Sequence, residues 1–257
     1  MKNLTKINVP DHHNLMSEIE SIGYSIIKNC VSKEFVSTQR SRWLPVFDKR
    51  NVEKKFVRGN LILGEENFLS YSEIDAYCMF RNFEFLWNET DDEDALALHI
   101  KLHRYRNKMQ GLDQNFGLNY NDTNYGVYIS TSYYPAGIGK LVAHKDGHKD
   151  VPILHYMLPF TFKGKDYDEG GLFIKDSADE TIDLDALVEP GDVIFFDGRR
   201  EHWVDTIKSK ELNSLGRLAV FAIPTHFIRD SFYQGIRRSL TISLREILSK
   251  VGIIKLS

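Results

Sequence analysis

Two histidines and two aspartates lie within nine residues of this chain, in the stretch VAHKDGHKD from Val142 to Asp150. In an extended segment, His144 and Asp146 point to the same side, because strand side chains alternate with a period of two. An imidazole and a carboxylate together suit a divalent transition metal, but such a site needs at least a third ligand. We interpret His148 and Asp150 as solvated loop residues, with a contact to substrate or to the metal ligands as the alternative.

A candidate third ligand is His202, in the stretch VEPGDVIFFDGRREHWVDTI. An apolar run and a glycine turn place it at the start of a strand, and several short strands fit between Asp146 and His202. A jelly roll can return His202 to the side of the first pair. Two histidines and one carboxylate on one face of an octahedral ion leave three positions open, as in non-heme Fe(II) oxygenases.

Arg217, in GRLAVF, opens the last strongly apolar run. An arginine that faces inward from a buried strand is costly without an anionic partner, and its guanidinium binds a carboxylate through two hydrogen bonds. We therefore expect Arg217 to hold the distal carboxylate of a chelating oxo acid. The alternative is a structural pair with a carboxylate of the core.

The elements that must position these residues follow from local patterns. Helical spacing of apolar residues and helix-end signals predict three helices: NLMSEIESIG, SKEFVSTQRSRWLPVF and DDEDALALHIKLHRYRNKMQGL. The first is expected to stop at Gly23 and the second to begin at Ser32. From Tyr125 on, β-branched and aromatic runs predict six short strands: YGVYISTSYY, VPILHYMLPFTF, GGLFIKD, DVIFFDG, HWVDTI and RLAVFAIPTHF. A mainly β protein with helices is expected, with a jelly-roll core buttressed by N-terminal and C-terminal helices.

We expect a single domain over residues 1–257, because the chain has no internal repeat, low-complexity tract or linker. Residues 1–120 are expected to form a helical or mixed support and lid, residues 121–228 the catalytic jelly roll, and residues 229–257 a helical tail. The aromatic segment from Phe68 to Trp87 is interpreted as a lid or substrate wall, or as ordinary packing against the β core.

Composition limits the partners and the compartment. Hydrophobic residues make up 42% of the chain and charged residues 27%, and the net charge of -3 argues against nucleic-acid binding. The two cysteines do not suggest a disulfide framework, and no run of eighteen apolar residues occurs. We expect a cytoplasmic protein, a monomer or homodimer, with neither a nucleic-acid nor a membrane partner.

The motifs, taken in order, resemble the double-stranded β-helix core of the 2-oxoglutarate/Fe(II)-dependent dioxygenases. The matching pieces are YYPAGIGKLVAHKD, DEGGLFIKD, VEPGDVIFFDG, EHWV and GRLAVFAIP. The opening IESIGYSIIKNCVSKEFV is similar to the N-terminal segment of phytanoyl-type members, and together these pieces cover about half of the chain. The H-x-D pair alone is a weak signal, whereas the ordered set is much more specific.

This resemblance implies that His144, Asp146 and His202 bind catalytic Fe(II), and that Arg217 binds the co-substrate 2-oxoglutarate, which reacts with O2. Many relatives have Arg-x-Ser, in which the serine also binds oxoglutarate, but here the position is Ala219. The missing hydroxyl is expected to come from one of three residues that share a face of the first core strand: Tyr128, Ser130 or Tyr134.

The resemblance also implies a reaction. It is the hydroxylation of an unactivated C–H bond of a small molecule, an amino acid or a natural-product intermediate, with formation of succinate and CO2. Halogenating relatives have Gly or Ala at the position of Asp146, so its presence favours hydroxylation or a related oxidation. Three alternatives stay open: a peptidyl or protein hydroxylase, a metal-dependent jelly-roll isomerase or hydrolase that does not use oxoglutarate, and a non-catalytic binding module.

Further residues are candidates for substrate contact. His155, in PILHYML, faces the cavity and touches substrate or oxoglutarate, or it is a core histidine. Arg199 and Arg200 precede His202, where they meet an anionic substrate at the cavity mouth or are plain surface charge. His148 is a fourth candidate. The pair His99 and His103 has zinc-binding spacing but no third ligand, so an amphipathic helix surface is expected there.

Overall fold

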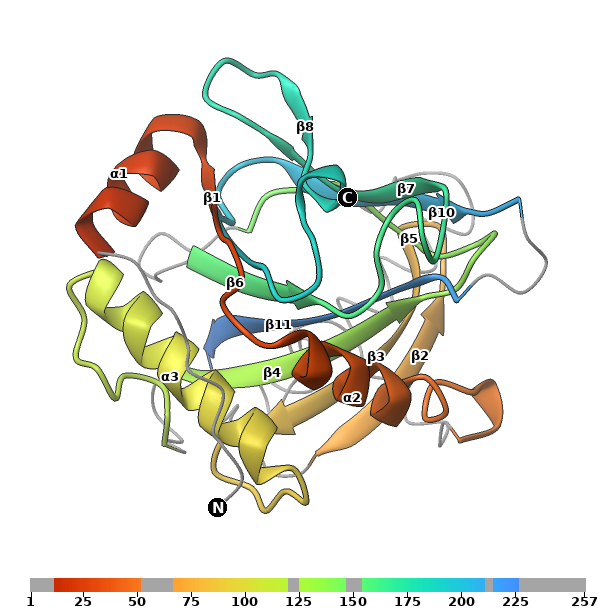
Figure 1. The fold of residues 1–257 in the computed structure, drawn as a ribbon, viewed down its shortest axis with the longest axis horizontal. Coiled ribbons are helices and arrows are strands. Elements are labelled where there is room, and N and C mark those ends of the chain that lie inside the picture. The colour runs from red at the N-terminus through yellow and green to blue at the C-terminus, as the bar shows by residue number, and fades with distance from the viewer. Residues whose placement is uncertain (1–11, 52–66, 120–124, 147–153, 211–214, 227–257) are drawn as a thin grey trace, which may run out of the picture.

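The computed structural model describes residues 12–51, 67–119, 125–146, 154–210 and 215–226. Across these ranges, eleven strands form one antiparallel sheet in the order β1-β9-β6-β11-β4-β3-β5-β10-β7-β8, with β2 paired to β3. The sheet curls, so that strands distant in this order face one another across an apolar interior (Figure 1). The expected mainly β architecture is confirmed.

The three predicted helices are present, although the second ends at Trp43, before the Leu-Pro pair that the prediction included. They are α1 (His12–Ile22), α2 (Lys33–Trp43) and α3 (Glu93–Met109), with short 3-10 turns η1 (Lys49–Asn51) and η2 (Asp185–Leu187). The first helix stops at Gly23, whose φ of 96° suits a residue without a Cβ atom. Ser32 and Asp92 cap the second and third helices by accepting hydrogen bonds from backbone N–H groups of the first turn.

The six predicted strands are all present, and four further strands join them besides β1 (Tyr24–Ile27). The N-terminal additions are β2 (Phe68–Glu73) and β3 (Tyr77–Phe85), which form a hairpin from the aromatic segment. The others are β4 (Tyr125–Tyr134), β5 (Lys140–His144), β6 (Leu154–Pro159), β7 (Glu169–Lys175), β8 (Thr181–Asp183), β9 (Val193–Asp197), β10 (His202–Lys208) and β11 (Arg217–His226). Because β3 pairs with β4, the aromatic segment is part of the sheet itself.

Alternate residues of the central strands separate two cores. The outer face carries Leu158, Phe195 and Val220, which belong to one apolar cluster with residues of all three helices. The inner face carries Met157 and Ile194, in a second cluster that extends to β7 and β10. In Figure 1, α2 and α3 lie across β4 and β11, so the helices cover the outer face and leave the interior of the curl to the strands.

The prediction that His99 and His103 lie on an exposed surface of α3 is wrong. His99 and His103, expected on an amphipathic surface, are buried with 4% and 0% of their surface exposed. His99 Nδ1 lies 3.1 Å from the hydroxyl of Tyr156, and His103 Nε2 lies 2.7 Å from the carbonyl oxygen of Phe116. Helical spacing alone did not show which side of α3 meets the sheet.

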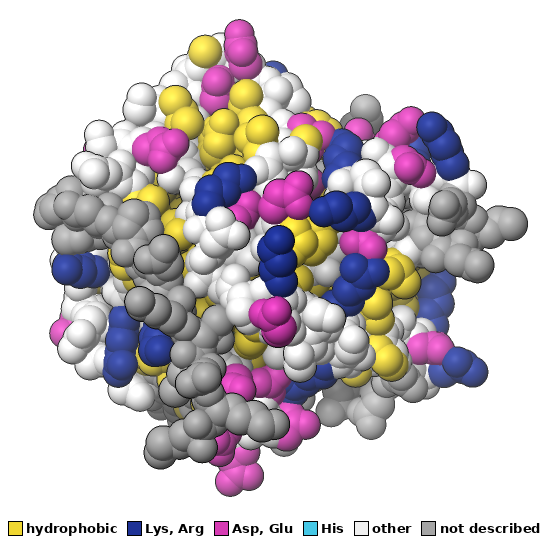
Figure 2. Space-filling view, in the orientation of Figure 1, with side chains coloured by type: hydrophobic (Ala, Val, Ile, Leu, Met, Phe, Trp, Pro, Cys, Tyr) yellow, Lys and Arg dark blue, Asp and Glu magenta, His cyan; other side chains and the backbone are white. Residues whose placement is uncertain are grey.

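The described surface is mixed in charge. In Figure 2, basic and acidic side chains are interspersed over the face in view, in agreement with the small net charge. No helix within the described ranges is long and apolar enough to cross a membrane. The predicted helical tail, residues 229–257, lies outside the described residues, and the predicted division at residue 121 stays a prediction.

Candidate metal centre

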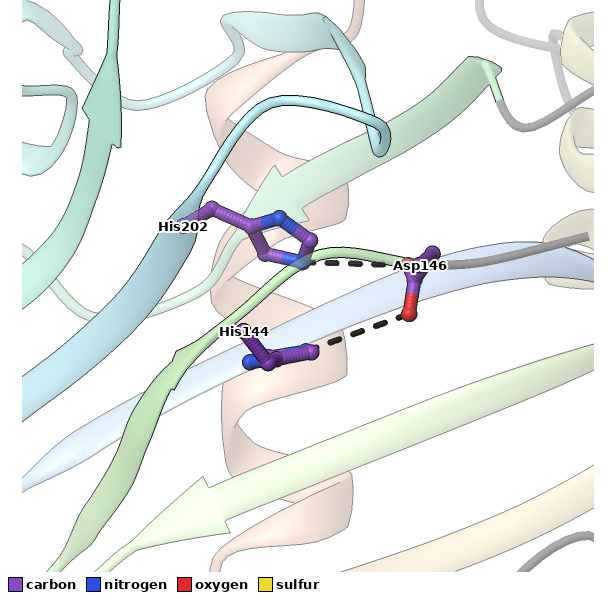
Figure 3. Close-up of side chains that lie close together, drawn as sticks. All are labelled: His144, Asp146 and His202. Atoms are coloured by element: carbon purple, nitrogen blue, oxygen red, sulfur yellow. Dashed lines mark ion pairs between the residues drawn. The ribbon is translucent and has the colours of Figure 1, made fainter. Parts of the chain in front are cut away.

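Two neighbouring strands bring the predicted ligands together. His144 ends β5 and His202 begins β10, and the two residues are directly opposite in the antiparallel register, with ring centroids 4.3 Å apart. Asp146 follows β5, and its backbone N–H donates to the carbonyl of Gly198 in the turn before β10. One potential ligand atom from each residue lies within 4.8 Å of the others, and Figure 3 shows the three side chains converging.

The backbone fixes the tautomer of both histidines. Nδ1 of His144 lies 2.9 Å from the carbonyl oxygen of Val142, and Nδ1 of His202 lies 2.9 Å from that of Arg200. Because a carbonyl oxygen only accepts, each Nδ1 carries the proton and each neutral ring keeps its Nε2 lone pair free. These Nε2 atoms lie 3.9 Å and 3.7 Å from the oxygens of Asp146, too far for hydrogen bonds. Two free Nε2 lone pairs and the Asp146 carboxylate therefore face a common point.

His155 contacts the carboxylate of Asp146, one of the three candidate metal ligands. It lies on β6 with 1% of its surface exposed, and its Nε2 is 2.7 Å from Oδ2 of Asp146. The ring also packs against Phe196 of β9, with centroids 4.9 Å apart. Its Nδ1 has no hydrogen-bond partner among the described residues. His155 therefore lies beside the candidate metal ligands with Asp146 as its partner, and its contact with substrate or oxoglutarate stays a prediction.

The electrostatics favour the metal-binding protonation states. Burial raises the pKa of Asp146, but the hydrogen bond from His155 and the nearby rings of His202 and His144 outweigh it, so the net pKa lies below the ordinary value. Burial, together with the charges of His144 and His155, lowers the pKa of His202 to about 4. At neutral pH the site thus offers an ionised carboxylate and a neutral imidazole, the forms that bind divalent ions.

Arg217 is inside the fold but already has an anionic partner. Its side chain is buried, and Nε and Nη2 donate to the two carboxylate oxygens of Asp185 at 2.6 Å and 3.0 Å. Asp185 also accepts from the hydroxyl of Tyr167 and the backbone N–H of Leu172. Despite burial, the charge of Arg217 keeps the pKa of Asp185 below its ordinary value. The arrangement is the structural pair that the sequence left open as the alternative.

The hydroxyl-bearing residues at alternate positions of β4 are all buried. Tyr128, Ser130 and Tyr134 are each at most 7% exposed, and the hydroxyls of Ser130 and Ser132 lie 3.2 Å apart. The Arg217 guanidinium lies over the Tyr134 ring, 5.6 Å from its centroid. The predicted hydroxyls therefore line the same face as the arginine.

The remaining predicted residues lie at the edge of the site or outside the described ranges. Arg199 is 72% exposed and pairs with Asp197, whereas Arg200 donates to the carbonyl of Asp176. Its own carbonyl orients His202. His148 and Asp150 lie outside the described residues.

Sequence reasoning missed two charged residues of the inner face. Asp185 lies after β8 in IDLDALV, where no local pattern marks it as a partner of Arg217. Arg81 lies on β3 in CMFRNFEF. It alternates in phase with Met79 and Phe83, which are buried, so the segment read as a strand would have placed Arg81 on the same face.

Comparison with solved structures identifies proteins of similar fold. No family model matches the sequence, and no curated protein matches it. A prolyl-4-hydroxylase from Pseudomonas putida has a similar structure, with a TM-score of 0.57, 14% identity and coverage of 86% of this chain and 100% of that one. This chain has the double-stranded β-helix fold.

Two further structures share this fold over most of their length. A putative oxygenase from Shewanella oneidensis aligns with a TM-score of 0.54 and 13% identity over 97% of this chain and 98% of its own. The non-heme alpha ketoglutarate dependent carbocyclase SnoK from nogalamycin biosynthesis has the same TM-score and identity over 86% and 85%. Likeness at these identities concerns the fold, and the chemistry rests on the residues of the site.

Proposed function

We propose that this chain is an Fe(II)- and 2-oxoglutarate-dependent oxygenase that hydroxylates an unactivated C–H bond of a small molecule. The observation that carries the proposal is the convergence of His144 Nε2, His202 Nε2 and the Asp146 carboxylate. Two imidazoles and one carboxylate leave open positions on an octahedral ferrous ion, as a chelating oxo acid and O2 require. The similar fold of the solved oxygenases supports the same conclusion.

The donor set fits a ferrous ion on its own chemistry. Both Nε2 lone pairs are free because the Nδ1 protons are held by backbone carbonyls, and the low pKa of Asp146 keeps the third ligand ionised. A ferrous ion held by these three residues would supply the redox chemistry by which O2 oxidises oxoglutarate to succinate and CO2 and places its other oxygen atom in the substrate's C–H bond.

The protein's own part is positioning and exclusion of water. The carbonyls of Val142 and Arg200 hold the two imidazole rings, and His155 holds the carboxylate of Asp146. The apolar inner cluster, in which Phe196 packs against the rings of His155 and His202, limits the access of water to the site.

Peptide hydroxylation is the second candidate, which the likeness to the Pseudomonas putida prolyl-4-hydroxylase supports. The two candidates differ in substrate and share the metal centre. Succinate release, screened across free amino acids and related small acids in one arm and proline-containing peptides in the other, distinguishes them.

The deciding experiment uses anaerobically purified protein with Fe(II) and oxoglutarate, and monitors the weak visible charge-transfer band of the chelate. We expect the band in the wild type and in Asp113→Asn, an exposed control far along the chain, and its loss in Asp146→Asn and His202→Ala. No band in the wild type, combined with hydrolysis or isomerisation supported by Zn2+, would overturn the proposal.

A further inference from the structure

The inner face carries a second arginine, Arg81 on β3. Its register partner on β4 is Ser132, which in turn pairs with Ala219 of β11. Residues directly opposite in an antiparallel sheet project to the same face, so Arg81 shares a face with the β4 hydroxyls and with Arg217.

The guanidinium of Arg81 lies over β4. Its central carbon is 5.9 Å from the ring centroid of Phe83 on β3 and 5.8 Å from that of Phe221 on β11. Since β4 runs between these two strands, the charged end reaches across the row of Ser130 and Ser132.

Arg81 has no anionic partner among the described residues. None of the ion pairs within those ranges includes it, and its Nε atom is buried without a hydrogen-bond partner, while its side chain hydrogen-bonds the neutral hydroxyl of Tyr134. Arg217, on the same face, is neutralised by the two oxygens of Asp185. Arg81 is partly buried, and its guanidinium has no carboxylate partner among the described residues, so it is available to an anionic ligand that enters the sheet.

The guanidinium of Arg81 lies close to Tyr128 and Tyr134, which are near the candidate metal centre and the Asp185–Arg217 pair respectively. Burial raises the pKa of Tyr128, Arg81 lowers it, and Asp146 raises it, so the phenol lies near both the metal ligand and the arginine. Burial likewise raises the pKa of Tyr134, which Arg81 and Arg217 both lower. A ligand that extends from the metal along β4 therefore meets Arg81.

We propose that Arg81 binds a carboxylate inside the curled sheet, namely the distal carboxylate of the oxo acid that chelates the metal, and that Arg217 is a structural residue. This inference rests on the proposed function. The sequence led us to expect Arg217 as the residue that binds this carboxylate. We assign the role to Arg81 because Arg217 already has a bidentate carboxylate partner, whereas Arg81 has none.

The test measures binding without turnover. Protein loaded with Mn(II), which supports chelation, is titrated calorimetrically with 2-oxoglutarate and with 2-oxopentanoate, which has a methyl group in place of the distal carboxylate. In Arg81→Gln we expect the Kd of 2-oxoglutarate to rise about 30-fold or more, because a charge-assisted pair is lost. The Kd of 2-oxopentanoate is expected to stay within about two-fold of the wild-type value, since that ligand lacks the group that Arg81 binds.

Matched variants complete the experiment. Arg104→Gln, on the exposed side of α3, should bind both ligands as the wild type does, and Arg217→Lys should keep the wild-type Kd for 2-oxoglutarate. Retained 2-oxopentanoate binding shows that Arg81→Gln is folded with an intact metal site. If that variant will not fold, Arg81→Lys, which keeps the charge but loses the two-pronged geometry, is expected to give a smaller loss of the same kind.

Two results overturn the inference. One is an unchanged Kd for 2-oxoglutarate in the Arg81 variants, which would leave Arg81 for a carboxylate of the primary substrate. The other is loss of 2-oxoglutarate affinity in Arg217→Lys alone, which would return the anchor to Arg217. Failure of the metal-loaded wild type to bind either oxo acid is a different result, because it overturns the proposed function as well.

Discussion

The Nε2 atom of His155 lies 2.7 Å from Oδ2 of Asp146, a contact that joins β6 to the segment after β5 across the interior of the curled sheet. The same carboxylate faces His144 through its other oxygen, at 3.9 Å. His155 therefore fixes the rotation of a carboxylate that would otherwise turn freely at the end of a strand.

Replacing His155 should weaken metal binding without removing a ligand. In His155→Phe, which keeps an aromatic ring but no donor, we expect the Mn(II) Kd to rise about 10- to 100-fold, the usual cost of losing an outer partner of a ligand. His155→Gln, which keeps an N–H donor, should lose less. Titration of the apo protein with Mn(II) measures both, and equal affinities for the two variants and the wild type would contradict the positioning role.

The second glycine of DEGGLFIKD, Gly171, should be required for stability because its backbone packs against the side chain of Asp185. Gly171 has a φ of 109°, and a Cβ atom there would lie 2.5 Å from Oδ2 of Asp185, the oxygen that pairs with Arg217. Gly171→Ala is therefore expected to lower the free energy of unfolding by about 2 kcal/mol or more. Gly164→Ala is the control, because Gly164 also has a positive φ but its Cβ would meet open space. Urea denaturation that shows equal losses for both would rule out the clash.

The Asp185–Arg217 pair should behave as a buried structural ion pair. Asp185→Asn leaves the guanidinium uncompensated, and we expect it to lower the free energy of unfolding by about 3 kcal/mol. The double variant Asp185→Leu/Arg217→Met should recover part of that loss, because no buried charge remains. Glu169→Gln, which removes a carboxylate from an exposed pair with Lys208, should leave stability nearly unchanged. A double variant less stable than Asp185→Asn would contradict this account.

Local patterns were sufficient for much of the fold and for selecting three residues that the structure brings together. The helix signals at Gly23 and Ser32 act within one turn, and the period of two explains why His144 and Asp146 point together. Asp185 was missed because its partner lies on a distant strand, and no short-range rule links them.

Arg81 was missed for a different reason. The aromatic residues around it hid the alternation of a strand, so the hairpin of β2 and β3 was not expected in the sheet. A charged residue in phase with Met79 and Phe83 becomes visible as an inner-face cation only once that pairing is known.

The two buried histidines of α3 should make stability depend on pH. Burial lowers the pKa of His99 to about 4 and, together with the charge of Arg106, that of His103 to about 2. In the unfolded chain both have a pKa of about 6.5. Below a pH of about 6.5 both histidines bind a proton in the unfolded state but stay neutral in the folded state. The free energy of unfolding therefore falls as pH drops from about 6.5 toward 4. Each such histidine contributes a slope of about 1.4 kcal/mol per pH unit.

The variant His99→Gln removes one of the two titrating histidines and so tests the contribution of His99 alone. The glutamine amide can still donate to the hydroxyl of Tyr156, which accepts from His99 Nδ1 because it donates to the His99 carbonyl. Urea unfolding at several pH values between 4.5 and 7.5 should give a stability curve for His99→Gln that is shallower than the wild-type curve by one proton. His202 titrates in both proteins, so its contribution cancels in the difference. Parallel curves would mean that His99 gains its proton equally well in the folded and unfolded states, which its burial against Tyr156 argues against.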